Sequence, residues 1–148
     1  MTYEQWDAVA DSINPIMALL VIALPFLLRP DRENRRLGFF AATGIGMAIM
    51  YALGWLDQRL LIWSAMGLDY STHTGFAIVL IVSIWHWNRR AGALGTAVGM
   101  AYAVLMLYQR YHTAADVLST AVVITAFTWI VHGARRAIAT AAGDRRDG

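Results

Sequence analysis

The sequence predicts an all-α integral membrane protein, a bundle of about five transmembrane helices. Of its 148 residues, 58% are hydrophobic and 15% are charged, whereas soluble domains are about half apolar and about a quarter charged. The apolar residues form long runs, and a helix needs about 20 of them to span a bilayer. Short polar connections separate these runs. The length of the chain, 148 residues, suits a single domain.

The first two spans are apolar runs bounded by arginines. Ile13–Leu28 contains no charged residue and is followed by Arg29, and Leu37–Leu56 begins directly after Arg36. The first dozen residues include Glu4, Asp7 and Asp11 and no basic residue. We therefore do not expect a signal peptide, which has a positively charged start. The run Leu60–Met66 is too short to span, and we expect it to be interfacial or re-entrant.

The remaining three spans alternate with polar segments. Gly75–Trp87 reaches spanning length only if the polar residues 70–74 begin the same helix. The next run holds Gly95 and Gly99 four residues apart, a spacing that lets helices approach closely, either within the chain or in a homo-oligomer. A basic cytoplasmic tail, 135–148, follows the fifth run. We place the spans at 13–28, 37–56, 70–87, 91–108 and 114–134.

The arginines predict the orientation of the bundle. The chain has 12 basic residues besides histidine, all of them arginine, and ten fall on one side of a five-span topology. These ten are Arg29, Arg32, Arg35, Arg36, Arg89, Arg90, Arg135, Arg136, Arg145 and Arg146. By the positive-inside rule that side is cytoplasmic, which puts the N-terminus outside and the C-terminus inside. We expect a multi-pass protein of a bacterial-type inner membrane; the net charge of +2 does not favour a nucleic-acid partner.

The other two arginines lie on the outer side, near the two outer histidines. Arg59 precedes His73 in the chain, and Arg110 stands two residues before His112. An anionic ligand at this face would explain why these four residues gather there. We therefore expect Arg59 and Arg110 to bind such a ligand.

Two polar clusters on the outer side can be interpreted as a catalytic site or as helix caps. His112 and Asp116 share a face if their segment is helical, and a carboxylate on an imidazole N–H fixes its tautomer. The sequence from Thr113 to Asp116 also matches a capping box, and Ser71 or Thr72 could cap the third span. The two interpretations are compatible, because helix N-termini favour anions.

Residues 37–132 resemble the type 2 phosphatidic acid phosphatase superfamily, which includes sphingomyelin synthase-like phosphotransferases. The segment from Tyr70 to His73 is similar to the family motif Pro-Ser-Gly-His, and His112 with Asp116 matches His-x-x-x-Asp. The chain departs from the family in three respects. One helix of the family's usual six-helix core is absent. The first motif (Lys, six residues, Arg-Pro) is missing, and Met106 stands where the third motif has its arginine.

The resemblance implies a lipid phosphatase or phosphotransferase that works without metal or cofactor. His112 would attack phosphorus and form a phosphohistidine, Asp116 would orient it, and His73 would protonate the leaving oxygen. The substrate would be a lipid phosphate or diphosphate, such as a polyprenyl or phospholipid species, and the acceptor water or a hydroxyl group. The expected phosphate-binding residues are Arg110, Arg59, Ser71, Thr72 and Thr74, with Asp69, Tyr70 and Tyr111 as accessory residues.

Two other functions stay open at this point. The four histidines form one pair near each face, so the chain could be a b-type haem electron carrier. We otherwise expect the inner pair, His86 and His132, to snorkel at the interface beside Arg89 and Arg135. The missing first motif is also compatible with a catalytically inactive structural subunit.

Overall fold

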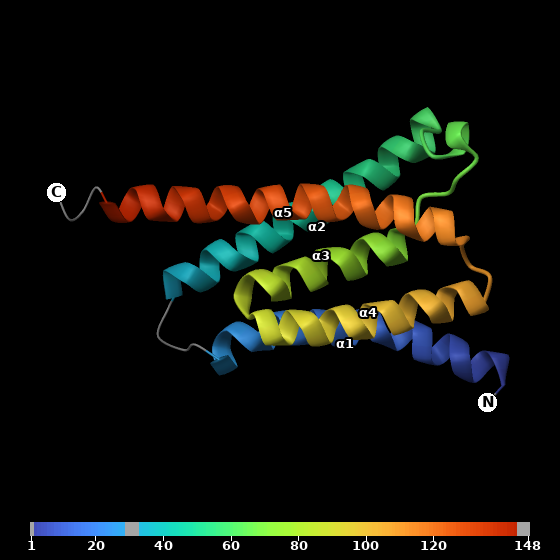
Figure 1. The fold of residues 1–148 in the computed structure, drawn as a ribbon, viewed down its shortest axis with the longest axis horizontal. Helices are drawn as coiled ribbons and strands as arrows, with labels where there is room; N and C mark the ends of the chain where they lie inside the picture. Colours follow the sequence, from blue (N-terminus) through green and yellow to red (C-terminus); the bar gives the residue numbers. More distant parts are fainter. Residues whose placement is uncertain (1, 29–32, 145–148) are drawn as a thin grey trace.

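The computed structural model describes residues 2–28 and 33–144, and this part of the chain is helical with no strand. The all-α prediction is confirmed. Figure 1 shows the helices side by side, with the start of α1 and the end of α5 at opposite ends of the bundle. The elements are α1 (Tyr3–Leu28), α2 (Glu33–Leu60), the 3₁₀ helix η1 (Ser64–Met66), α3 (Thr72–Trp87), α4 (Arg89–Tyr108) and α5 (Ala114–Asp144).

Four of these helices are long and apolar enough to cross a membrane, rather than the expected five. They are α1, α2, α4 and α5, whereas α3 has 16 residues and rises only about 24 Å at about 1.5 Å per residue. The short helix lies at the centre of the bundle and packs on all four long ones (Figure 1). Most of its residues are buried. The four long helices therefore cover most of the surface of α3.

The helices extend beyond the apolar runs from which they were predicted. The first begins at Tyr3 instead of residue 13, and the last continues to Asp144, so the segment expected to be a tail is helical up to that residue. The residues from Ala134 to Ala142 are rich in alanine, the strongest helix former, which explains the extension. Residues 145–148 of the predicted tail lie outside the described residues.

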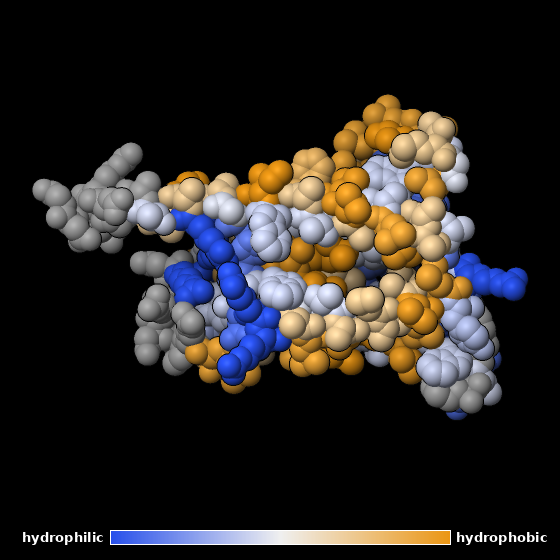
Figure 2. All heavy atoms as spheres, in the orientation of Figure 1, coloured by the Kyte–Doolittle hydropathy of each residue, from blue (hydrophilic) through white to orange (hydrophobic). Residues whose placement is uncertain are grey.

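Six described arginines lie at one end of the bundle, as their sequence distribution predicts. Arg135 donates to the carbonyl of Arg35, Arg136 donates to the carbonyl of His86, and Arg35 lies over the ring of Trp87. Figure 2 shows the resulting hydrophilic band across α5 and the start of α4. Arg29, Arg32, Arg145 and Arg146 fall outside the described part of the chain.

The glycines of α4 allow it to pack closely on α3. A Cβ on Gly99 would collide with Cδ1 of Ile81, and one on Gly92 would lie 2.7 Å from the Cα of Trp85. Gly95 faces Ile84 at 3.7 Å, an ordinary contact. The pair Gly95 and Gly99 therefore serves packing within the chain, one of the two roles that the sequence left open.

Candidate functional site

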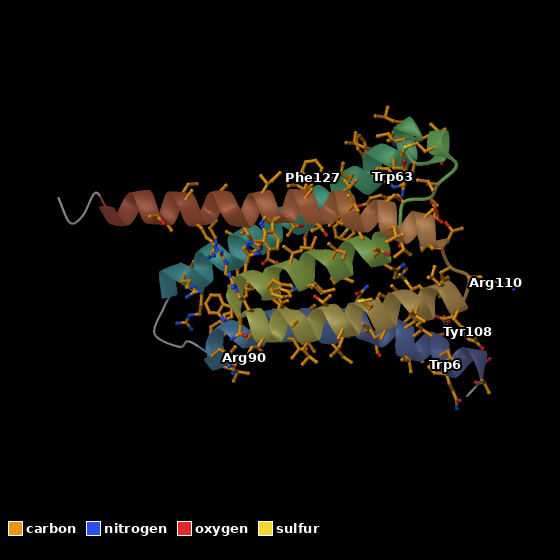
Figure 3. All side chains as sticks on the ribbon, in the orientation of Figure 1. Trp6, Trp63, Arg90, Tyr108, Arg110 and Phe127 are labelled. Carbon is orange, nitrogen blue, oxygen red and sulfur yellow. The ribbon has the colours of Figure 1, made fainter. Side chains whose placement is uncertain are left out.

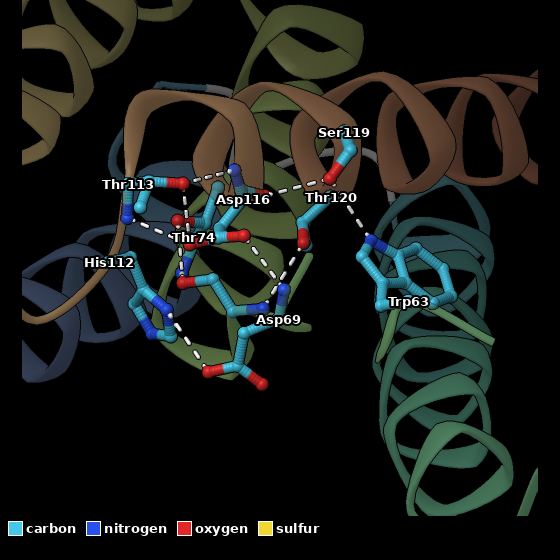
Figure 4. A network of polar contacts seen from close by, with 9 residues as sticks. Trp63, Asp69, Thr74, His112, Thr113, Asp116, Ser119 and Thr120 are labelled. Atoms are coloured by element: carbon cyan, nitrogen blue, oxygen red, sulfur yellow. Dashed lines mark hydrogen bonds and ion pairs between the residues drawn. The ribbon is translucent and has the colours of Figure 1, made fainter. Parts of the chain in front are cut away.

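The two polar clusters predicted from the sequence meet at the end of the bundle opposite the arginine band. Asp116 Oδ1 accepts a hydrogen bond from the backbone N–H of Asp69 at 2.7 Å. Thr120 Oγ1 accepts from the backbone N–H of Ser71 at 3.1 Å. Figure 4 shows how these bonds tie the connection before α3 to the first turns of α5. Two segments almost 50 residues apart thus form one polar network.

Ser71 and Thr74 form the N-terminal cap of α3. Ser71 Oγ accepts from the backbone N–H of Thr74 at 3.3 Å, and the two hydroxyl groups lie 2.9 Å apart. Both side chains are buried, whereas Thr72 is exposed. The predicted cap is confirmed at Ser71. Of the three hydroxyls expected to bind phosphate, only that of Thr72 faces the surface.

Thr113 and Asp116 form the capping box that the sequence predicts for α5. Asp116 Oδ2 accepts from the backbone N–H of Thr113 at 2.8 Å and from its hydroxyl at 2.7 Å. Thr113 Oγ1 in turn accepts from the backbone N–H of Asp116 at 3.3 Å. Both oxygens of this buried carboxylate therefore accept hydrogen bonds: Oδ2 from Thr113 within the cap, and Oδ1 from Asp69 in the segment before α3.

His112 forms an ion pair with Asp69, and no described hydrogen bond joins it to Asp116, although the two lie close enough to interact electrostatically. Its Nδ1 lies 3.5 Å from Oδ2 of Asp69, and the two side chains are 12% and 72% exposed. That nitrogen is buried and has no hydrogen-bond partner among the described residues, so the contact with Asp69 is an ion pair without a hydrogen bond. The expected bond to Asp116 fails because α5 begins at Ala114, so His112 precedes the helix and the four-residue spacing does not align the two side chains.

His73 lies on the first turn of α3 in a different setting. It is exposed and lines a hollow of about 330 Å³ between α1, α2 and α3. The other lining residues are Asn14, Pro15, Tyr51, Thr72 and Phe76. Asn14 donates to the backbone carbonyl of His73 at 3.4 Å. No described contact joins His73 to His112, so the structure does not show the two expected catalytic histidines in contact.

Neither outer arginine contacts the histidines through a described interaction. Arg110 ends α4 in a Schellman motif: its φ is 59°, and the N–H of Tyr111 reaches the carbonyl of Met106. Figure 3 shows its side chain extending away from the bundle. The guanidinium of Arg59 lies 5.7 Å from the centre of the Trp55 ring. Both arginines are exposed.

The two tyrosines expected as accessory residues serve packing between elements. Burial, with the nearby charge of Asp57 adding to it, raises the pKa of Tyr70 to about 12. The neutral hydroxyl of Tyr70 donates to the carbonyl of Met50 at 2.8 Å, beneath the ring of Trp63. The hydroxyl of Tyr111 is bonded to Asp7 on α1. The bonds shown for these two hydroxyls therefore go to Met50 and Asp7.

The inner histidines are buried in the bundle and do not snorkel as expected. His86 is 5% exposed and His132 is 0% exposed, and their rings stack with centres 4.6 Å apart. His132 Nε2 lies 3.1 Å from the hydroxyl of Ser83, which accepts from Thr43. The sequence does not predict that Thr43, Ser83 and His132 meet inside the bundle. The helices are apolar on all sides, so hydropathy does not identify which face of each helix points inward.

The haem alternative does not fit the inner pair. Axial ligands lie on opposite faces of a haem with a nitrogen of each pointing at the iron, whereas these rings stack directly on each other. Nε2 of His132, the nitrogen that would have to reach the iron, lies 3.1 Å from the hydroxyl of Ser83 instead. Across residues 2–28 and 33–144, no group of three or more potential metal ligands comes together.

Replacing Ser83 with alanine should lower the free energy of unfolding by about 1–3 kcal/mol, because it leaves Nε2 of the fully buried His132 without its partner. Thermal unfolding in a fixed detergent measures this. Ser12→Ala is the matched control, since that hydroxyl bonds only its own helix at an exposed position. Equal unfolding temperatures for the two variants would contradict the role of Ser83.

Comparison of the chain with protein-family models, with curated proteins and with solved structures finds no match.

Proposed function

We propose that the chain is a multi-pass membrane enzyme that hydrolyses or transfers the phosphoryl group of a lipid phosphate or diphosphate. The supporting observation is the His112–Asp69 pair, in which a carboxylate faces Nδ1 of the imidazole. A carboxylate at Nδ1 favours the tautomer whose Nε2 carries a lone pair, and that nitrogen is the nucleophile. The site faces the outside of a bacterial-type inner membrane, opposite the arginine-rich end.

In this mechanism Nε2 of His112 forms a bond to phosphorus while the bond from phosphorus to the leaving oxygen breaks. Asp69, rather than Asp116, orients the imidazole and stabilises its positive charge. His73 gives a proton to the leaving oxygen, and water or a hydroxyl group then takes the phosphoryl group from His112. The N-terminal turns of α3 and α5 favour the charge of the phosphate through their dipoles. No step uses a metal ion.

The test is a screen of radiolabelled lipid phosphates with the purified full chain in detergent. Free phosphate would indicate hydrolysis, and a new labelled lipid in the presence of an acceptor would indicate transfer. Activity should survive excess EDTA. Activity that EDTA abolishes and zinc or magnesium restores would reject the phosphohistidine mechanism.

Arg110 allows a test that separates phosphate binding from folding. Its φ of 59° is one that glycine adopts without strain, so Arg110→Gly should keep or raise stability, by up to about 1 kcal/mol. If the guanidinium binds phosphate, the same variant should raise KM about tenfold. Steady-state kinetics and thermal unfolding measure both. Unchanged KM in a stable variant would show that Arg110 only terminates α4.

A catalytically inactive structural protein is the second candidate. The observation in its favour is that Ser71, Thr74, Thr113 and Asp116 are already bonded within the two caps. On this alternative the polar network only joins two loops. Absence of turnover on every lipid phosphate in the screen, with a well-folded chain, would favour it.

A further inference from the structure

A second pocket, of about 240 Å³, lies at the arginine-rich end, away from His112. Its lining combines two arginines, a histidine and two tryptophans, contributed by α3, the start of α4 and the second half of α5. These residues are Trp85, His86, Arg89, Trp129 and Arg136. Among the described side chains, the charged groups that line the pocket are two guanidinium groups, and these favour an anion.

The two arginines keep donor groups available for a ligand. Arg136 donates one hydrogen bond, from Nη2 to the carbonyl of His86 at 3.0 Å, and a guanidinium has five N–H donors. Arg89 is exposed at the first position of α4. Among the side chains that the structure describes, which exclude those of residues 29–34 and 141–148, neither arginine is seen in an ion pair with a carboxylate. Paired guanidinium groups of this kind are suited to phosphate oxygens.

An apolar hollow on the surface of α5 neighbours the pocket at Trp129. Trp129 also lines a shallow hollow of about 550 Å³ along α5, which reaches Leu118 and Ala121. The same two residues line a third hollow, of about 210 Å³, between α3, α4 and α5. Figure 2 shows hydrophobic side chains along this side of α5 and in the depression between α5 and α4. A cationic pocket therefore lies next to an apolar hollow on α5, with Trp129 lining both, and this hollow shares Leu118 and Ala121 with the next one.

We propose that this pocket binds the phosphate of an anionic phospholipid, with an acyl chain lying in the apolar hollow along α5. The arrangement matches an amphiphile, because the charged and apolar parts share Trp129. Free phosphate would use the arginines but not the hollow. Trp85 and Trp129 suit the headgroup level of a bilayer, and the arginine-rich end is the one that the positive-inside rule assigns to the anionic cytoplasmic leaflet.

The test is titration of the purified full chain in detergent with phosphatidylglycerol or phosphatidylcholine, with bound lipid counted by native mass spectrometry. The anionic lipid should bind about tenfold or more tightly than the zwitterionic one. Arg89→Gln should weaken phosphatidylglycerol binding about tenfold. The matched control is Arg90→Gln, since Arg90 is the exposed neighbour that does not line the pocket; it should change the affinity less than about twofold. Arg89 has no described structural bond, so its variant should fold.

Three results would overturn the proposal. Equal binding of the two lipids would remove the preference for negative charge. Equal losses in the Arg89 and Arg90 variants would indicate diffuse attraction rather than a pocket. Displacement of phosphatidylglycerol by inorganic phosphate at comparable concentration would show that the apolar hollow adds nothing and that the ligand is free phosphate. None of these readouts depends on activity at His112, so this site and the proposed enzyme can fail separately.

Discussion

Replacing His112 with glutamine is expected to abolish turnover on lipid phosphates, by at least about a thousandfold, and to leave no phosphoenzyme that can be trapped with labelled substrate. Glutamine fills similar space but has no ring nitrogen that can attack phosphorus. Stability should change little, within about 0.5 kcal/mol, because the ion pair that His112 forms is a 3.5 Å contact with a carboxylate that is 72% exposed. Activity and thermal unfolding are measured in the same detergent.

The neighbouring carboxylate supplies the graded control for this result. Asp69→Asn keeps the backbone N–H that bonds Asp116, so the loop connection stays intact while the charge near His112 is lost. Turnover should fall, by less than in His112→Gln, since the nucleophile remains but its orientation and charge stabilisation are weakened. Full activity in His112→Gln would overturn the proposed function. Full activity in Asp69→Asn would remove only the orienting role of Asp69.

The helical fold could be predicted because long apolar runs leave few alternatives. Each predicted span corresponds to one helix, and the positions of the connections agree within a few residues except at the two ends of the chain. The central position of α3 could not be predicted. All its sides are apolar, so the sequence does not indicate whether lipid or other helices surround it, and its 16 residues become informative only once its neighbours are in place.

Local features of the site were predictable and tertiary ones were not. The caps at Ser71 and Thr113 depend on residues three positions apart, which the sequence displays directly. The His112–Asp69 pair joins residues 43 positions apart, and nothing in their spacing indicates that they meet. Since Asp69 lies three residues from the end of its connection to α3, its place depends on the bond from its N–H to Asp116. Asp116, which is close to His112 in the sequence, therefore positions Asp69, which forms the ion pair with His112.

Replacing Asp116 with alanine is expected to lower the free energy of unfolding by about 2–4 kcal/mol. The change removes the cap of α5, worth about 1 kcal/mol, and leaves the N–H of Asp69 without its acceptor. Hydrogen exchange at Asp69 and Thr113 should accelerate, since both N–H groups lose their bond to the carboxylate. The matched control is Asp69→Ala, which removes an exposed carboxylate but keeps its N–H, and should leave stability nearly unchanged.

Replacing the two aspartates should therefore affect different properties, stability in one case and turnover in the other. Asp116→Ala should act on stability first, and on turnover only as far as it loosens Asp69; Asp69→Ala should act on turnover with little change in stability. Wild-type unfolding of Asp116→Ala, together with complete loss of its turnover, would restore Asp116 as the group that orients His112. In that case the three hydrogen bonds that occupy its carboxylate would have to rearrange when substrate binds.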